Sequence, residues 1–426
     1  MTEADHLLTA TAEPATATEG IEALPFFDLD AFRTDPFAVV DELHQQGALL
    51  ARSDRGVEVL SRDLVRDWFK DDRFRVPNVH DYAAKGGSEL LTHFVEHGDL
   101  LFMSPERHRR VRQIFARAFA VRRVREYREA IVAHGEHLLA QFAEAGEADL
   151  AVQFTSRFAP GALCSVLGIP LDEVDHFVDA AQDLRFIVAH PIAPHLDRLD
   201  KCLGTLHDYV VPLLAERTAR PREDYLTDLI AAAGDGRLTP DELVWGTVNL
   251  LLAGSDTTAR QLASSLYFMI AEGIWEQMAA EPDQIRTAID ESTRLLPVAF
   301  VLVRVPLVDV VVGGTRIPAG TTVLLNNFAA GRDPAAFDAP ATFSLDRKLP
   351  IFPTVFGAGP HHCIGEQLAW LEMTSGAQLL TGALTDLQFA ADTTFQTWTE
   401  PFSGPIAMPV TFSRRSPATS DAGLTA

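Results

Sequence analysis

The feature that most constrains this chain is a short glycine-punctuated segment, FGAGPHHCIG at residues 356–365, which leads directly into a helix-forming run. Cys363 therefore lies where a helix begins, and the unpaired N–H groups and dipole of a helix N-terminus favour negative charge. This position predicts a thiol whose pKa is lowered toward a metal-binding thiolate. Gly357 and Gly359 have no Cβ atoms, so the backbone can approach a large planar partner closely.

The other residues of this segment agree with a planar partner at the sulfur. Phe356 is expected to pack over the sulfur and exclude water, and Gly365 removes a Cβ atom from the first helical turn. A lone cysteine is ordinarily a buried core residue. A zinc site at His361, His362 and Cys363 is a second alternative, but three adjacent positions in one loop reach a single tetrahedral ion poorly.

The segment resembles the haem-binding loop of the cytochrome P450 family, which reads Phe, two residues, Gly, one residue, Arg or His, one residue, Cys, one residue, Gly. The resemblance implies haem b with its iron ligated by Cys363, and it makes Phe356, His361 and Gly365 cofactor-binding residues. It also implies a mainly α fold with a small β region, an α-rich triangular prism. The haem of that fold lies between an oxygen-binding helix and the helix after the cysteine.

Length and composition agree with an enzyme of this kind. The chain has 426 residues, of which 47% are hydrophobic, and a formal net charge of −23, which argues against nucleic acid or an anionic membrane as the main partner. We expect one haem domain at 21–415 between disordered tails at 1–20 and 416–426. The absence of an 18-residue apolar run and of a signal-peptide pattern, with only three cysteines, predicts a cytoplasmic monomer.

The remaining elements are expected as follows. Asp35 caps a helix over 36–46, and apolar runs near Leu49 and 57–60 indicate a hairpin. The glycine-containing stretch 74–102 has weak periodicity, so we expect a long structureless binding loop or lid, with a tolerated insertion as the alternative. Helical patterns dominate from Ser104 to about Leu380. Strand-like runs interrupt them at 298–305, 308–312 and 321–325.

A long apolar helix is predicted over 240–270, with the unfavourable sequence AGSDTT in its middle. Gly, Asp and Thr weaken a helix interior, and such turns often mark functional distortions. An ordinary polar helix face is the plain alternative. The segment resembles the family's oxygen-binding motif, in which Ala253 contacts haem. Asp256 and Thr257 then form an acid and alcohol that relay protons to bound dioxygen.

Other residues fit the family's haem contacts. His108 and Arg112 share one helix face and resemble ligands of the haem propionates. Arg304 and His361 resemble a third and a fourth ligand. Nine arginines lie within 106–129, which predicts a basic patch for an acidic electron carrier, although a solvated helix face is the plain account of most of them.

Glu291 and Arg294 have the spacing of the family's buried structural ion pair, although an i,i+3 pair is commonplace on surface helices. A third basic residue joins this pair in the family. Either Arg332 or Arg347 fits that role from the sequence.

Periodicity also predicts the substrate pocket. Asn249 shares a helix face with Thr257, Phe300 and Leu302 align with Arg304 along a strand, and Phe402 resembles the family's last substrate-contacting loop. We therefore expect a mainly lipophilic small molecule with at least one oxygen or nitrogen function, whose size Phe300 limits. The amide of Asn249 reads that polar group, or instead caps a neighbouring backbone group.

The implied activity is a monooxygenase that uses dioxygen to hydroxylate or otherwise oxidise this molecule. Gly313 and Gly314 lead into a turn, so there is no dinucleotide fingerprint, and electrons are expected from a ferredoxin and its NAD(P)H-dependent reductase. Peroxide-driven oxidation, desaturation and coupling are alternatives within the haem-thiolate class. A haem-based gas sensor or haem carrier is an alternative of another class, which needs neither the acid and alcohol nor an access loop.

Overall fold

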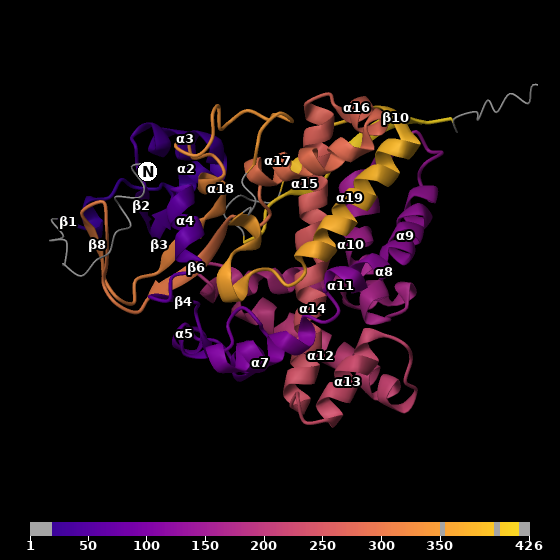
Figure 1. Cartoon of the computed structure of the whole chain (residues 1–426), viewed down its shortest axis with the longest axis horizontal. Helices are drawn as coiled ribbons and strands as arrows, with labels where there is room; N and C mark the ends of the chain where they lie inside the picture. The colour runs from indigo at the N-terminus through magenta and orange to yellow at the C-terminus, as the bar shows by residue number, and fades with distance from the viewer. Residues whose placement is uncertain (1–18, 350–353, 396–400, 417–426) are drawn as a thin grey trace, which may run out of the picture.

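Helices form most of the structure, a computed structural model that describes residues 19–349, 354–395 and 401–416. Figure 1 shows most of the labelled strands beside the N-terminal helices at the left and the large helical body at the right, with β10, Leu384–Phe389, at the edge of that body. Residues 1–18 and 417–426 of the expected tails lie outside the described residues. The expected boundary at residue 20 was wrong, because Glu19–Gly20 forms β1 and pairs with Thr315–Ile317, β8.

The helices account for the long amphipathic stretches of the sequence. α3 begins at Pro36 because the Asp35 carboxylate accepts hydrogen bonds from the N–H groups of Phe37 and Ala38 at 3.1 and 3.0 Å, as predicted. The α-helices are α2 Leu29–Thr34, α3 Pro36–Gln45, α4 Arg62–Trp68, α5 Val79–Ala84, α6 Glu89–His97, α7 Pro105–Phe115, α8 Val121–Glu126, α9 Arg128–Ala140, α10 Ser156–Leu167, α11 Val174–Asp183, α12 Leu196–Ala219, α13 Tyr225–Gly234, α14 Pro240–Ser255, α15 Thr257–Ala271, α16 Trp275–Ala280, α17 Ile285–Leu295, α18 Asn327–Ala330 and α19 Glu366–Ala383.

The largest sheet has five strands in the order β2-β3-β9-β6-β4. The predicted hairpin is confirmed, because β2 and β3 pair antiparallel. β9 pairs parallel with β3 and antiparallel with β6, which places the strand that carries Arg304 inside the sheet. The strands are β2 Leu50–Ser53, β3 Gly56–Val59, β4 Phe74–Arg75, β6 Val301–Pro306 and β9 Val323–Asn326.

Three smaller sheets complete the β region, in the orders β1-β8-β7, β10-β13-β5 and β11-β12. The predicted strand near 308–312 is present as β7. The strands not yet given are β5 Glu147–Asp149, β7 Val310–Val312, β11 Thr394–Phe395, β12 Pro405–Ala407 and β13 Pro409–Arg414.

The stretch 74–102 is not the structureless loop that its weak periodicity suggested. It contains β4, α5 and α6. Asn78 and Asp81 form a capping box at the start of α5, and the Ser88 hydroxyl accepts a hydrogen bond from the N–H group of Leu91 at 3.0 Å. The expectation was wrong because these caps start two short helices whose apolar faces are too brief for a clear period.

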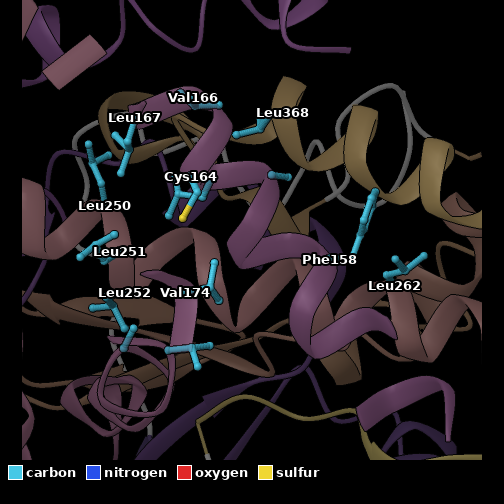
Figure 2. Close-up of a cluster of buried hydrophobic side chains, with 14 of the residues drawn as sticks. Phe158, Cys164, Val166, Leu167, Val174, Leu250, Leu251, Leu252, Leu262 and Leu368 are labelled. Atoms are coloured by element: carbon cyan, nitrogen blue, oxygen red, sulfur yellow. The ribbon is translucent and has the colours of Figure 1, made fainter. Parts of the chain in front are cut away.

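The hydrophobic core lies among α9, α10, α14, α15 and α19. Figure 2 shows Cys164 of α10 among leucine and valine side chains that include Leu250 and Leu251 of α14. Cys164 is fully buried and Cys202 is 5% exposed, so the prediction that both are core residues is confirmed. Within the described residues, no helix combines the length and the apolar character that crossing a bilayer requires.

Candidate active site

The cysteine segment folds as a tight loop before α19. Gly357 and Gly359 have φ values of 69° and 70°, a left-handed conformation that glycine adopts without strain. The Cys363 N–H group donates to the Phe356 carbonyl at 2.8 Å, which closes the loop. Cys363 therefore lies two residues before Gly365, the N-cap of α19, close to the position that the sequence predicted.

The electrostatics of Cys363 differ from the expectation. Burial raises the pKa of its thiol to about 11, and the backbone N–H groups of Gly365 and Glu366, with the Arg112 charge, oppose this rise only in part. The sequence predicted a lowered pKa, and the two N–H groups act in that direction, but in the haem-free chain the surrounding protein raises the pKa on balance, although the Cys363 side chain is itself exposed at the cavity. A cation bound to the sulfur would supply the missing stabilisation, since a coordinating thiol is deprotonated.

Cys363 faces a cavity of about 310 Å³ that lies between the cysteine loop and the α14–α15 helices. The cavity is lined mainly by apolar side chains, including Leu250, Leu302 and Phe402. In Figure 1, α14 and α15 run end to end through the centre of the molecule, with α19 beside α15. The two motifs singled out in the sequence thus meet across one cavity.

One end of the cavity carries cationic and polar groups. Arg112, Arg304 and His361 line it, and His108 lies behind His361 with ring centroids 4.2 Å apart. The Arg112 guanidinium donates to the His362 carbonyl. Arg304 is 4% exposed, it donates to the Val303 carbonyl at 2.9 Å, and burial lowers its pKa to about 10.

These groups have unused hydrogen-bonding capacity. His108 Nε2 and His361 Nδ1 are buried and have no hydrogen-bond partner among the residues that the structure describes. Burial, followed by the charge of His108, lowers the pKa of His361 to about 3. Buried donors and a buried guanidinium require acceptors, and carboxylates satisfy both. The cavity, with a sulfur on one wall and cations at one end, therefore fits a planar iron cofactor that bears carboxylates. Haem is such a cofactor.

The long helix predicted over 240–270 is interrupted in its middle. α14 starts where predicted, with Pro240 at its first position and a capping box between Thr239 and Glu242. It ends at Ser255, and α15 begins at Thr257. The break has a local cause, because the Ser255 and Thr257 hydroxyls donate to the Leu251 and Ala253 carbonyls and disturb the helical ladder.

The acid and the alcohol lie at this break. Thr257 and Ala253 line the cavity, and the Thr257 hydroxyl donates to the Ala253 carbonyl at 2.8 Å. Asp256 is 2% exposed, and its Oδ1 accepts a hydrogen bond from Arg260 Nε at 2.7 Å, whereas its Oδ2 has no partner among the described residues. The sequence analysis missed Arg260, although its position four residues after Asp256 is a signal for an ion pair.

The substrate side of the cavity is partly as expected. Asn249, Leu302 and Phe402 line it, and Phe402 forms a β-bridge with Ala299. Phe300 is not among the lining residues. Its ring packs at 4.8 Å from the ring of Phe328, because the regular alternation of β6 begins only at Val301.

Two buried polar residues of the cavity wall were missed. Glu372 of α19 is 2% exposed, and burial raises the pKa of its carboxyl group well above the ordinary value. A hydrogen bond from Thr258 lowers this pKa, but by less than burial raises it. Arg185 is also buried in this wall and lies 4.5 Å from the Phe186 ring centroid. Neither residue has a neighbouring motif that marks it in the sequence, and tertiary packing places both in the cavity wall.

The Glu291–Arg294 pair is buried and bidentate, with Nε–Oε2 and Nη2–Oε1 distances of 2.8 and 2.7 Å. Arg347 is the third partner, because its Nε donates to Glu291 Oε1 at 2.8 Å. Arg332 instead lies 3.4 Å from Asp41. This network fixes α17 to the segment that precedes the cysteine loop.

Comparison with known proteins agrees with this geometry. The sequence pattern of the family described as Cytochrome P450 matches residues 75–381. Nocardicin C N-oxygenase of Nocardia uniformis subsp. tsuyamanensis is 30% identical over 321 residues, which are 74% of this chain and 79% of that protein. Vitamin D(3) 25-hydroxylase of Pseudonocardia autotrophica is 31% identical over 279 residues, 64% of this chain and 67% of that protein.

Solved structures share the fold. The cytochrome P450 enzyme CxnD, for C–S bond formation in chuangxinmycin biosynthesis, superposes with a TM-score of 0.82 at 27% identity, over 90% of this chain and 96% of that one. CalO2 superposes with a TM-score of 0.83 at 24% identity, over 91% of this chain and 98% of that one. The chain belongs to the cytochrome P450 family, and it is a monooxygenase of that family. Membership implies a haem whose iron is held by a cysteine thiolate.

Proposed function

We propose that this chain uses haem b, ligated by Cys363, to insert one oxygen atom of dioxygen into a mainly lipophilic small molecule. The observation that carries the proposal is that Cys363 and Thr257 line one mainly apolar cavity from different elements. The haem, when bound, supplies the oxygen activation, and its thiolate ligand donates electron density that favours O–O cleavage. The protein sets access, orientation and proton supply.

The cationic end of the cavity is assigned to the propionates. Arg112 and Arg304 suit carboxylates because a guanidinium forms bidentate, charge-assisted hydrogen bonds. His361, with His108 packed against it, adds a neutral donor whose free Nδ1 supports the same role. Gly365 belongs to the face that the macrocycle covers, because a Cβ atom built there would meet no protein atom within 4 Å.

Proton supply is assigned to Asp256 and Thr257. The Thr257 hydroxyl already donates to the Ala253 carbonyl, so its oxygen is left to accept a hydrogen bond in the cavity. Arg260 holds Asp256 Oδ1, and among the described residues Oδ2 has no partner, so this oxygen is available to a proton relay. The acid then delivers protons from the protein side of the helix break, and the alcohol positions them.

The substrate is assigned to the part of the cavity around Asn249. Asn249 is 8% exposed and lines the cavity, and its amide makes no hydrogen bond to any residue that the structure describes. A buried amide without a partner costs roughly 1 to 3 kcal/mol, so a polar group of the substrate, or an ordered water, is expected there. Leu302 and Phe402 supply apolar contact, and Phe300 no longer serves as the size limit.

Electrons are assigned to a separate ferredoxin with an NAD(P)H-dependent reductase. Arg112 of α7 contacts the His362 carbonyl, so the basic patch of α7 and α8 adjoins the cysteine loop. Arg109, Arg117, Arg125 and Arg128 are exposed and have no ion pair among the described residues. These free charges suit an acidic carrier.

A library screen on the haem-loaded protein tests the proposed function. Compounds that enter the cavity are expected to displace iron-bound water and shift the haem spectrum, and one of them should be oxidised when ferredoxin, reductase, NAD(P)H and dioxygen are supplied. Oxidation with hydrogen peroxide but none with dioxygen and electrons would favour the peroxide-driven alternative. Ligand binding without any turnover would favour a sensor or carrier.

A further inference from the structure

α6 and the first turn of α14 bring two imidazoles and a carboxylate together outside the cavity. His93 and His97 are four residues apart on α6 and therefore share one face. Asp241 lies opposite them in α14. The ligand atoms of these three residues all lie within 4.8 Å of one another, and His93 Nε2 is 3.5 Å from Asp241 Oδ2.

Packing beneath this cluster holds the two helices in fixed positions. Phe94 and Val95 are fully buried on the inner face of α6. At the end of α6, a Cβ atom built on Gly98 would lie 2.6 Å from the Trp245 carbonyl oxygen, so the two backbones are as close as glycine allows. The Trp245 ring also lies 6.0 Å from the His93 ring. The three ligands are therefore held close together before any ion binds, which lowers the cost of binding.

The chemistry of the cluster suits a borderline transition-metal cation. Two imidazole nitrogens and one carboxylate oxygen are donors that such ions prefer, and they lie within 4.8 Å of one another. Arg107 does not leave an uncompensated positive charge, because it lies 3.3 Å from Glu96 and 3.5 Å from Glu242. The side chain of Asp241 is 56% exposed, so water can complete the coordination.

We propose that His93, His97 and Asp241 bind a divalent transition-metal ion, with Zn²⁺ as the best match to two imidazoles, one carboxylate and one water. Such an ion ties α6 to the start of α14, the helix that carries Asn249 farther along. The bound ion would thereby restrain the stretch 74–102, which contains α5 and α6. This inference does not depend on the proposed substrate or electron donor.

Isothermal titration of the untagged, haem-loaded protein with Zn²⁺ tests the site, because iron then occupies Cys363. One ion per chain is expected, and His93→Ala or His97→Ala should weaken its binding at least about tenfold. His80→Ala is the matched control, since His80 is exposed on neighbouring α5 and lies outside the cluster, and it should bind as the wild type does. Hydrogen exchange should slow on adding Zn²⁺ in α6 of the wild type, and not in His97→Ala.

Two results would overturn the site. One is a wild type that binds no zinc at millimolar concentration. The other is equal zinc affinity in the wild type, His93→Ala and His97→Ala, which would place the ion elsewhere. Both variants change half-buried positions outside the cavity, and near-wild-type haem content would show that they fold.

Discussion

Replacing Arg304 by methionine should change the haem-free and haem-loaded proteins in opposite directions. In the structure Arg304 is 4% exposed, its guanidinium donates a hydrogen bond to the Val303 carbonyl, and the Phe69 ring centroid lies 5.1 Å away. Among the described residues no carboxylate pairs with it. It is a buried cation held in place for an anion that arrives with the cofactor.

The magnitude follows from the pKa. Burial lowers it from 12.5 to about 10, and that difference corresponds to about 3 kcal/mol of destabilisation of the folded, haem-free protein. Because the folded-state pKa is the lower one, the unfolded chain binds the proton more tightly. The penalty is therefore complete below a pH of about 10 and declines as the pH rises through that value. Arg304→Met removes the penalty at neutral pH, so the haem-free variant should be more stable by up to about 3 kcal/mol.

The haem-loaded variant should instead lose its cofactor faster, since one propionate loses its partner. Urea unfolding of the haem-free proteins and transfer of haem to an excess of apomyoglobin measure the two effects. Arg347→Met is the matched control, because Arg347 is paired with Glu291 and its loss should destabilise the haem-free protein by about 2 kcal/mol. A haem-free Arg304→Met protein less stable than the wild type, with unchanged haem transfer, would refute the reasoning.

Three further changes test the other assignments. Thr257→Ala should leave substrate binding nearly intact and release peroxide, so product formed per NAD(P)H consumed should fall; an unchanged ratio would contradict the proton role. Asn249→Leu should weaken binding of the native substrate by about 1 to 3 kcal/mol and spare analogues without the polar group; equal losses would make Asn249 a structural residue. Replacing Arg109, Arg117 and Arg122 together by Glu should slow ferredoxin-supported turnover most at low ionic strength without altering substrate affinity. Equal activity of the wild type and this variant at low ionic strength would show that the three arginines are solvated and do not bind the ferredoxin.

The parts of the site that were predictable are those in which local sequence determines geometry. Gly357 and Gly359 adopt positive φ values, which glycine tolerates best, so the tight loop before Cys363 can be predicted from its own residues. The weak turn at Asp256 is likewise visible, because hydroxyl side chains that compete for helix carbonyls are a local effect. Helix periodicity correctly aligned Asn249 with Thr257.

The parts that were not predictable depend on distant packing. Nothing near Glu372 in the sequence shows that α15 covers it, and nothing near Arg347 distinguishes it from Arg332 as the partner of Glu291. The net pKa of the Cys363 thiol depends on distant packing for the same reason. The helix N-terminus that lowers its pKa is local, whereas the burial that raises it comes from the whole fold.

The central claim is that Cys363 is the protein ligand of the haem iron. The most direct measurement is the absorption spectrum of the reduced, carbon monoxide-bound protein, compared with that of Cys363→Ser. The account predicts a strongly red-shifted Soret band in the wild type, as thiolate ligation gives, and its loss in the variant. A wild-type spectrum like that of a histidine-ligated globin, or a red-shifted band that survives in Cys363→Ser, would contradict it.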